Sequence, residues 1–407
     1  MGELDVAKKC GSSLSGLSLP VVSIIVVNYN YGRFLAEAVE SVFGQTYSNI
    51  ECIIVDNAST DNSSEVISQL QHWFPAIKYL QREENSGQNI AARDGFDASQ
   101  GEYIVFLDAD DFLFPAFVAT HIFVHLSLRI PVGLTSSDMV QTCGSRVVVS
   151  TCACVSDYVT SGKGRRPNLL RRIDDEIQGF WGISAPDSVF DSRLHFVPPY
   201  QASSWPWAPT SGNCFRRDAL RLFLNNPNLS KMRGGTDAYL LRGVSLLTGG
   251  VLIDMALAAY RVHGDNLFSK HADLHCMIAF QRDAPVDFNL LAKKLLIDHL
   301  IENVDLFLAK SIAPERFVDA LAALDSAWPS LPGAPTYAID KLIAEKPEIV
   351  GKTRLIKFVN CLKRLKFAPS INDERSDRSK TASRSPKAVR ASLEDDDADS
   401  RATTGKH

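Results

Sequence analysis

The chain of 407 residues carries 43 Lys and Arg against 47 Asp and Glu, and its formal net charge is −4 at pH 7. This length exceeds a usual single domain, the hydrophobic content of 45% is enough for a real core, and the acidic balance excludes a nucleic-acid-binding charge footprint. The eight cysteines lack zinc spacing and are expected to be reduced thiols in a cytosolic protein. Neither a signal peptide nor a membrane-spanning segment is predicted.

After a polar lead-in over residues 1–20, short apolar runs alternate with amphipathic segments. The apolar runs are rich in β-branched residues and predict buried strands at 21–27, 52–55, 77–80 and 103–107. The segments between them have helical spacing and predict helices at 33–43, 61–73 and 88–98. This alternation indicates parallel βαβ units, and therefore an α/β fold.

Polar side chains follow three of the predicted strands. The apolar run 104–107 leads directly into Asp108, Asp110 and Asp111, and the first two strands end in 28–30 and 56–57. Ligands of such sheets bind beyond the carboxyl ends of the strands, so these groups predict a binding cleft. Crowded carboxylates repel one another unless they share a cation, and oxygen ligands suit Mg²⁺ or Mn²⁺. A solvated acidic turn is the alternative.

The rest of the chain has weaker signals. Residues 145–205 are irregular but contain aromatic and proline residues, which predicts an ordered loop region that determines specificity. Residues 285–350 are expected to be helical. The tail from about 369 is rich in Ser, Arg, Lys and Asp and is predicted to be disordered.

Eight segments together resemble the family 2 glycosyltransferases, inverting enzymes with the GT-A fold. They are 28–30 (NYN), 41–47 (SVFGQTY), 53–61 (IIVDNASTD), 85–93 (NSGQNIAAR), 108–111 (DADD), 210–217 (TSGNCFRR), 235–237 (GTD) and 260–263 (YRVH). The resemblance implies a Rossmann-like mixed central sheet flanked by helices. It implies a domain over 21–268, with a donor-binding half at about 21–115 and an acceptor half at about 116–268. A helical extension over 269–367 and a disordered tail over 368–407 would follow.

The resemblance also implies a reaction. A sugar would pass from a nucleotide diphosphate sugar, UDP- or dTDP-linked, to a hydroxyl of a saccharide or lipid-linked saccharide during polysaccharide or glycoconjugate assembly. The Gln-x-x-Arg-Trp signature and membrane helices of the processive members are missing, which favours a non-processive enzyme.

A metal ion, Mn²⁺ or Mg²⁺, would neutralise the leaving diphosphate as a Lewis acid. The resemblance implies Asp110 as its ligand, with Asp108 facing the ribose or the metal shell; which of Asp108, Asp110 and Asp111 binds the metal directly stays open. His263 would bind the metal or donate to a phosphate, supported by Arg261. The alternative for His263 is a structural histidine.

For the nucleotide, Asp56 is expected to accept the imide N–H of a pyrimidine while Tyr29 stacks on the base and Arg93 helps to hold the nucleotide. A helix-cap or turn role is the alternative for Asp56. Further residues assigned to the nucleotide site are Asn30, Asn57, Asn89 and Asp108.

Asp237 is expected to be the general base that deprotonates the acceptor hydroxyl. The acidic pair of the family reads Thr236-Asp237 here, so the base is retained and its acidic neighbour is lost. Capping of the following helix is the alternative role for this carboxylate.

Three other functions compete with this interpretation. A phosphatase of the haloacid dehalogenase type would have Thr or Val two residues after its second Asp, where Phe112 stands. A sugar nucleotidyltransferase would open with a Gly-rich loop carrying Arg and Lys, which is not found. A catalytically degenerate GT-A binding module is disfavoured because the acids at 108, 110 and 237 are intact.

Residues 352–367 contain six basic residues and no acid, and their apolar side chains share one face of a helix. Such a helix lies in the headgroup region of anionic bilayers, which predicts peripheral contact of a cytoplasmic protein with the inner face of the plasma membrane. The alternative is a helix that docks on the globular domain and exposes its basic face to solvent.

Overall fold

The computed structural model describes most of the chain between residues 18 and 351, all of it within the unit 1–357. The described ranges are 18–171, 185–199, 205–266, 288–310, 316–326 and 337–351. The segment 352–367 lies outside the described residues, and its membrane contact stays a prediction.

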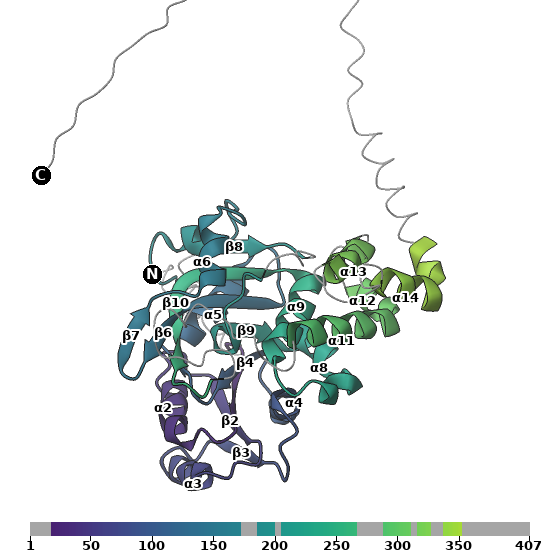
Figure 1. The fold of residues 1–407 in the computed structure, drawn as a ribbon. Coiled ribbons are helices and arrows are strands. Elements are labelled where there is room, and N and C mark those ends of the chain that lie inside the picture. Colours follow the sequence, from purple (N-terminus) through teal and green to yellow (C-terminus); the bar gives the residue numbers. More distant parts are fainter. Residues whose placement is uncertain are drawn as a thin grey trace, which may run out of the picture. The chain divides into compact units, whose positions relative to one another are not determined.

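The first half of the described chain is a parallel sheet with helical crossovers (Figure 1). Its strands lie in the order β3-β2-β1-β4, and every neighbouring pair in it is parallel. In chain order the elements are β1 (Val22–Asn28), α2 (Gly32–Phe43), β2 (Ile50–Asp56), α3 (Ser63–Trp73), β3 (Lys78–Gln81), α4 (Gln88–Ala98) and β4 (Tyr103–Asp108). The predicted alternation of strands and helices is therefore confirmed.

Each central strand contributes to two hydrophobic cores. Successive side chains of a strand point to opposite faces, so Ile25 and Ile53 pack with Phe96 of α4 on one face. Ile24 and Ile54 belong to the second core, together with residues of α2 and α3. Burial on both faces explains why these strands are almost continuously apolar in sequence.

The second half of the sheet makes it mixed, as the predicted fold requires. Beyond β4 the strand order is β9-β6-β10-β5, and β9 is antiparallel to both β4 and β6. Because β10 is parallel to β6, the carboxyl ends of β4, β6 and β10 meet at one edge of the sheet. The elements are β5 (Phe112–Leu113), α5 (Phe117–Ser127), β6 (Leu134–Cys143), β7 (Arg146–Val149), α6 (Ala153–Thr160), η1 (Phe190–Arg193), β8 (Leu194–Val197), η2 (Thr210–Gly212), β9 (Asn213–Arg216), α8 (Arg217–Leu224), η3 (Pro227–Lys231), α9 (Thr236–Thr248) and β10 (Gly250–Val262).

In the described residues after β10 lie the helices α11 (Phe288–Glu302), α12 (Val304–Lys310), α13 (Phe317–Ser326) and α14 (Tyr337–Glu345). They extend the core around α8 and α9 (Figure 1). His299 of α11 bonds the backbone oxygen of Leu222 at 2.8 Å, and the Phe307 and Phe223 rings lie 5.3 Å apart. In the part of the chain that the structure describes, no helix has the length and apolar character needed to cross a membrane.

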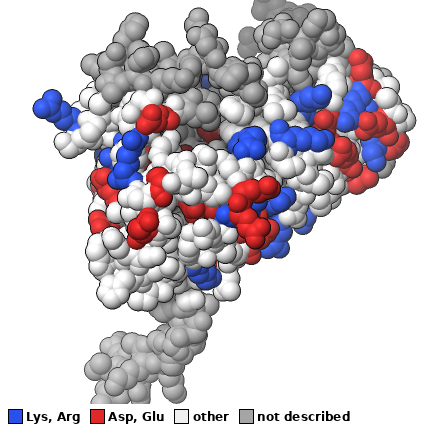
Figure 2. All heavy atoms as spheres, turned by 60° about the horizontal axis from the view of Figure 1, so that its bottom comes forward, with Lys and Arg blue, Asp and Glu red and all other residues white. Residues whose placement is uncertain are grey.

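The molecular surface mixes both signs of charge. On the face drawn in Figure 2, acidic and basic side chains are interspersed, and no broad area carries one sign alone.

Candidate active site

The three acids after β4 have different surroundings. Asp108 accepts a hydrogen bond from the Gln88 amide at 2.8 Å. Asp111 is buried, and its two carboxylate oxygens accept from the Ser211 hydroxyl at 2.7 Å and from the Arg261 backbone N–H at 3.0 Å. The Asp111 side chain thus ties the end of β10 to the end of β4. This arrangement leaves Asp108 and Asp110 as the acids that could contact a bound metal.

Asp110 and His263 are in direct contact. The Asp110 carboxylate lies 3.0 Å from His263 Nε2 and 3.4 Å from the Asn266 amide nitrogen. The imidazole is held between aromatic rings, with centroid distances of 4.7 Å to Phe34 and 5.2 Å to Tyr31. The structure therefore brings together two of the three predicted metal ligands, although they are far apart in the sequence.

Arg261 supports this contact. Its Nε donates to the backbone oxygen of Asp110 at 2.8 Å, and its guanidinium pairs with Glu37 at 2.6 Å. The side chain is buried and also lies over the Phe34 ring, with 4.9 Å from the guanidinium carbon to the ring centroid. The sequence indicated the supporting role of Arg261, but not its partner on α2.

Negative charge is concentrated at this edge of the sheet. Burial raises the pKa of Asp108, and the charges of Asp110 and Asp237 raise it further. The pKa of Asp111 is also raised well above its usual range by burial and by the charges of Asp110 and Asp108. Such repulsion between carboxylates is what a shared divalent cation relieves.

The donor set fits a metal held jointly with a substrate. Among the described residues, no group of three or more His, Cys, Asp or Glu side chains is arranged as a complete metal site. Asp110 and His263 offer two adjacent donor atoms. Magnesium-like ions commonly bind one or two carboxylates and take their other ligands from substrate phosphates and water, so this pair is sufficient on the protein side.

Asp56 lies buried at the end of β2. One carboxylate oxygen accepts from the Asn28 amide at 2.7 Å and from the Ser59 hydroxyl at 2.5 Å. The other oxygen, Oδ2, accepts from the Ser59 backbone N–H at 3.1 Å. A carboxylate oxygen has capacity for two hydrogen bonds, so Oδ2 can accept one more, from a base for example.

The other predicted nucleotide residues lie around the ends of β1 and β2. Asn30 adopts a left-handed backbone with φ of 59°, and its side chain accepts from the Thr60 backbone N–H at 2.7 Å. Asn57 donates to the Asn85 side chain at 3.0 Å. The Tyr29 ring is 42% exposed at the end of β1, which leaves a face available for stacking.

Arg93 is half-buried on α4. In the described part of the chain the structure records no ion pair for it, and its contact with a nucleotide stays a prediction.

Asn89 is fully buried and contacts a loop from the other half of the domain. Its amide nitrogen donates to the backbone oxygens of Met232 at 2.8 Å and Gly234 at 3.3 Å. Beside it, the Gln88 backbone N–H donates to the Arg233 oxygen at 2.7 Å. The start of α4 thus fixes the loop that leads into α9. The nucleotide role of Asn89 stays a prediction, because its observed contacts are with this loop.

Asp237 stands in the first turn of α9, directly after that loop. Its carboxylate accepts from the Ala238 backbone N–H at 2.7 Å, whereas the N-cap of the helix is Gly235. Burial raises the pKa of this carboxyl, whereas the positive charge of Arg242 lowers it. Because the charge of Asp237 also raises the pKa of Asp108, the predicted base and the predicted donor site belong to one electrostatic cluster.

Sequence reasoning missed Gln88, Ser211, Asn266 and Arg242. The Arg242 guanidinium lies over the Trp205 ring, with 4.7 Å to the centroid, and donates to Asn289 at 3.4 Å. Gln88 and Ser211 belong to recognised motifs, so motif membership could have selected them for closer examination. Arg242 lies outside every motif, and no signal in the sequence points to it.

The contact between α4 and the loop before α9 can be tested at Gly87. A Cβ atom there would lie 2.5 Å from the Arg233 backbone oxygen, and the backbone has φ of 88°. We expect Gly87→Ala to displace the loop that positions Asp237. Since a misplacement of about 1 Å can cost about 10²-fold in rate, the rate of turnover should fall by about that factor.

Gly144→Ala is the control for backbone strain. Gly144 also has a positive φ, 58°, but a Cβ there would have no neighbour within 4 Å. Its turnover should stay close to wild type. If Gly87→Ala and Gly144→Ala lose turnover equally and have the same melting temperature, displacement of the loop before α9 is not the cause of the lost turnover.

The chain is similar to proteins of a known sequence family. Residues 23–123 match the family model described as Glycosyl transferase family 2. Over 247 residues, which are 60% of this chain and 66% of the relative, it is 33% identical to "Uncharacterized glycosyltransferase alr2836" of Nostoc sp. strain PCC 7120. The chain belongs to glycosyltransferase family 2. Family membership sets aside the phosphatase alternative.

Other similarities are shorter or more distant. "Glycosyltransferase GlyG" of Streptococcus pneumoniae serotype 4 is 40% identical over 91 residues, 22% of this chain and 30% of the relative. The matched regions thus span less than two thirds of these curated relatives. The solved structure of S. aureus TarS 1-349 in complex with UDP gives a TM-score of 0.41 at 16% identity, covering 82% of this chain and 91% of TarS 1-349.

Proposed function

We propose that this family member is an inverting glycosyltransferase that uses a UDP- or dTDP-linked sugar and a saccharide or lipid-linked saccharide acceptor. The observation that carries the proposal is the position of Asp108. Its carboxylate is an electrostatic neighbour of Asp110, which contacts His263, and of Asp237. A group suited to holding a donor and a group suited to deprotonating an acceptor therefore share one cluster.

The donor nucleotide would lie across the ends of β1 and β2. Asp56 Oδ2 has capacity for one more hydrogen bond and suits the imide N–H of a pyrimidine. The exposed face of Tyr29 would stack on the base. Only uracil and thymine carry a ring N–H between two carbonyls, whereas adenine and cytosine have no ring N–H at that edge, which is why a UDP- or dTDP-linked sugar is proposed.

The diphosphate would lie at Asp110 and His263. A bound divalent ion would supply Lewis-acid neutralisation of the leaving diphosphate. The protein's contribution is positioning: Asn266 and the rings of Tyr31 and Phe34 hold the imidazole in contact with Asp110. Gln88 fixes the orientation of Asp108 beside them.

Transfer would be a single displacement with Asp237 as base. The acceptor oxygen forms a bond to the anomeric carbon while the bond from that carbon to the phosphate oxygen breaks. The hydroxyl proton passes to Asp237, and the nucleoside diphosphate leaves. Burial raises the pKa of Asp237, so its carboxylate is a stronger base than an exposed one. Transfer of one residue per encounter, at the inner face of the plasma membrane, completes the proposal.

Donor binding is testable without knowledge of the acceptor. Melting temperature should rise with a UDP- or dTDP-sugar in the presence of Mn²⁺, because a ligand at 100 times its Kd stabilises by about 2.7 kcal/mol. Purine nucleotide sugars and Mn²⁺ alone are the controls. A set in which no nucleotide sugar shifts the melting temperature would contradict the proposal.

Slow release of the nucleotide without acceptor distinguishes the enzyme from the degenerate binding module. A transferase hydrolyses its donor slowly, whereas a binding module retains the donor intact.

A further inference from the structure

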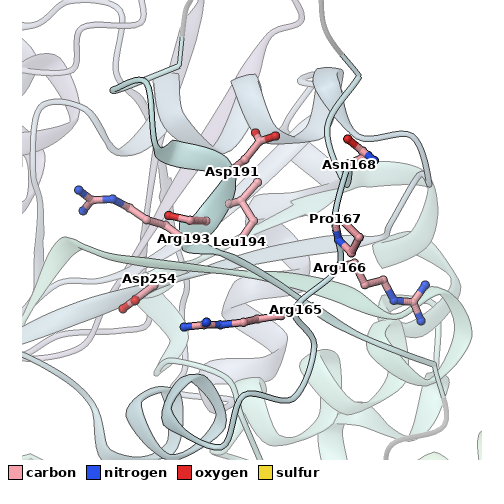
Figure 3. Close-up of a pocket in the computed structure, with 9 residues that line it drawn as sticks. Arg165, Arg166, Pro167, Asn168, Asp191, Arg193, Leu194 and Asp254 are labelled. Atoms are coloured by element: carbon pink, nitrogen blue, oxygen red, sulfur yellow. The ribbon is translucent and has the colours of Figure 1, made fainter.

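A hollow of about 700 Å³ is lined by residues that lie outside the motifs of the family (Figure 3). Four segments form it: the loop 165–168, η1, the start of β8, and β10 at Asp254. Its volume is within the range of about 300–1,000 Å³ that is common for small-ligand sites. None of its lining residues belongs to the site described above.

The loop 165–168 is anchored at both ends. Before it, the Gly164 backbone oxygen accepts from the Phe196 N–H at 2.8 Å, and φ of Gly164 is 81°. After it, Leu169 is buried, and its backbone oxygen accepts from the Arg129 N–H at 3.1 Å. This loop therefore presents its side chains from a fixed backbone, which lowers the entropic cost of binding a ligand.

An irregularity in β10 places an acid on the opposite wall. The register between β10 and β6 shifts between Ile253 and Ala256, and Asp254 lies inside this shift. Such bulges change the direction of a side chain relative to the regular alternation of a strand. Asp254 is exposed, and Figure 3 shows Arg165 extending toward it.

The lining combines guanidinium donors with carboxylate acceptors. Arg193 pairs with Asp187 at 3.1 Å, and the Arg166 guanidinium lies over the Phe196 ring, 4.2 Å from its centroid. Arg165 and Asp254 face the hollow, and neither forms an ion pair within the described ranges of the chain. Further lining groups are the side chains of Asn168, Asp191 and Ser192.

This mixture selects the class of ligand. An anion would pair with the guanidinium groups but be repelled by Asp191 and Asp254. A cation would pair with these two carboxylates but be repelled by the guanidinium groups. A hydroxyl group donates and accepts, so a ligand rich in hydroxyls can pair with both kinds of side chain. Planar carboxylate, amide and guanidinium groups can also bind neighbouring hydroxyls in pairs.

We propose that this hollow binds a saccharide unit of the acceptor, remote from the hydroxyl that reacts. This inference rests on the proposed function, since a second saccharide site remote from the reacting hydroxyl requires an oligosaccharide acceptor. Asp254 precedes His263 by nine residues of the same segment, so the two lie at most about 30 Å apart. The acceptor would then need several sugar units to reach the hollow from the reaction centre.

The test is direct binding of saccharides of increasing length. Oligosaccharides released from the surface polysaccharide of the source organism would be fractionated by size and titrated into the full chain by calorimetry. Affinity should rise with length and then level off. The double variant R165Q/D254N should weaken binding of the long fractions by about tenfold or more and leave the short fractions unchanged.

The matched control is R146Q/D305N, which removes the same charges from exposed positions on β7 and α12. It should bind every fraction as the wild type does. Binding independent of length, equal binding by R165Q/D254N, or no binding of any fraction by the wild type would overturn the inference. UDP binding with Mn²⁺, measured on the same samples, tests the proposed function separately: saccharide binding without nucleotide binding would reject that function and retain the hollow as a saccharide site.

Discussion

Replacing Asp237 by Asn should slow sugar transfer by about 10²–10⁴-fold, which is the usual contribution of a general base. The amide has nearly the same shape and can still accept a hydrogen bond from the Ala238 N–H, which the carboxylate accepts at 2.7 Å. Folding and donor affinity should therefore be preserved. Rate measurements at saturating donor, together with calorimetric titration of the nucleotide, check both expectations.

The pH profile separates the catalytic role from a structural role at the start of α9. Burial raises the pKa of Asp237 above its ordinary range, so the base becomes protonated and inactive as pH falls through that raised pKa. In the wild type the rate of transfer should therefore fall as the pH is lowered through this pKa. The residual rate of Asp237→Asn should not show this fall. Full activity in the variant, or loss of donor binding along with activity, would contradict the role of base.

Replacing Asp110 by Ala should abolish metal-dependent turnover. The change removes the carboxylate that lies 3.0 Å from His263 Nε2, and with it the pair of donor atoms available to a metal. Turnover at increasing Mn²⁺ should stay at background, and Mn²⁺ should no longer strengthen nucleotide binding.

Asp265→Ala is the matched control for this change. Asp265 lies on the same segment after β10, but its carboxylate is exposed and pairs with Arg33 at 2.6 Å. Exposed ion pairs contribute little to stability, so this variant should keep its response to Mn²⁺. Wild-type rates for Asp110→Ala at any Mn²⁺ concentration would show that the metal site is elsewhere.

The architecture follows from local patterns that sequence reasoning can detect. The strands around Ile25 and Val105 are apolar on both faces, which is the pattern of central strands covered by helices. The acids at 108–111 follow one of these strands, so their place at the carboxyl edge could be predicted from the α/β rule alone.

The contacts that shape the site are of longer range and could not be predicted in this way. Asn89 bonds the backbone oxygens of Met232 and Gly234, more than a hundred residues away. Asp111 is engaged by Ser211 and by the Arg261 backbone, so its role depends on how three distant segments pack. Periodicity and capping rules concern neighbours in sequence and do not predict contacts between residues that are far apart in it.

The hollow beside β10 shows the same limit more strongly. Its residues come from a loop, a 3₁₀ turn and a strand irregularity, and none of these has a periodic signal. Sequence analysis assigned specificity to 145–205 on composition alone. The structure adds particular residues on which that expectation can be tested, Arg165 within this range and Asp254 on β10 outside it.

The anomeric form of the sugar released during donor hydrolysis tests the central claim most directly. The donor that gives the largest thermal shift would be incubated with the full chain and Mn²⁺, without acceptor, and followed by proton NMR. With water as acceptor, an inverting transferase releases nucleoside diphosphate and a free sugar whose first anomer is opposite to that of the donor. A first anomer identical to that of the donor, or release of inorganic phosphate with the nucleotide–sugar bond intact, would contradict the account.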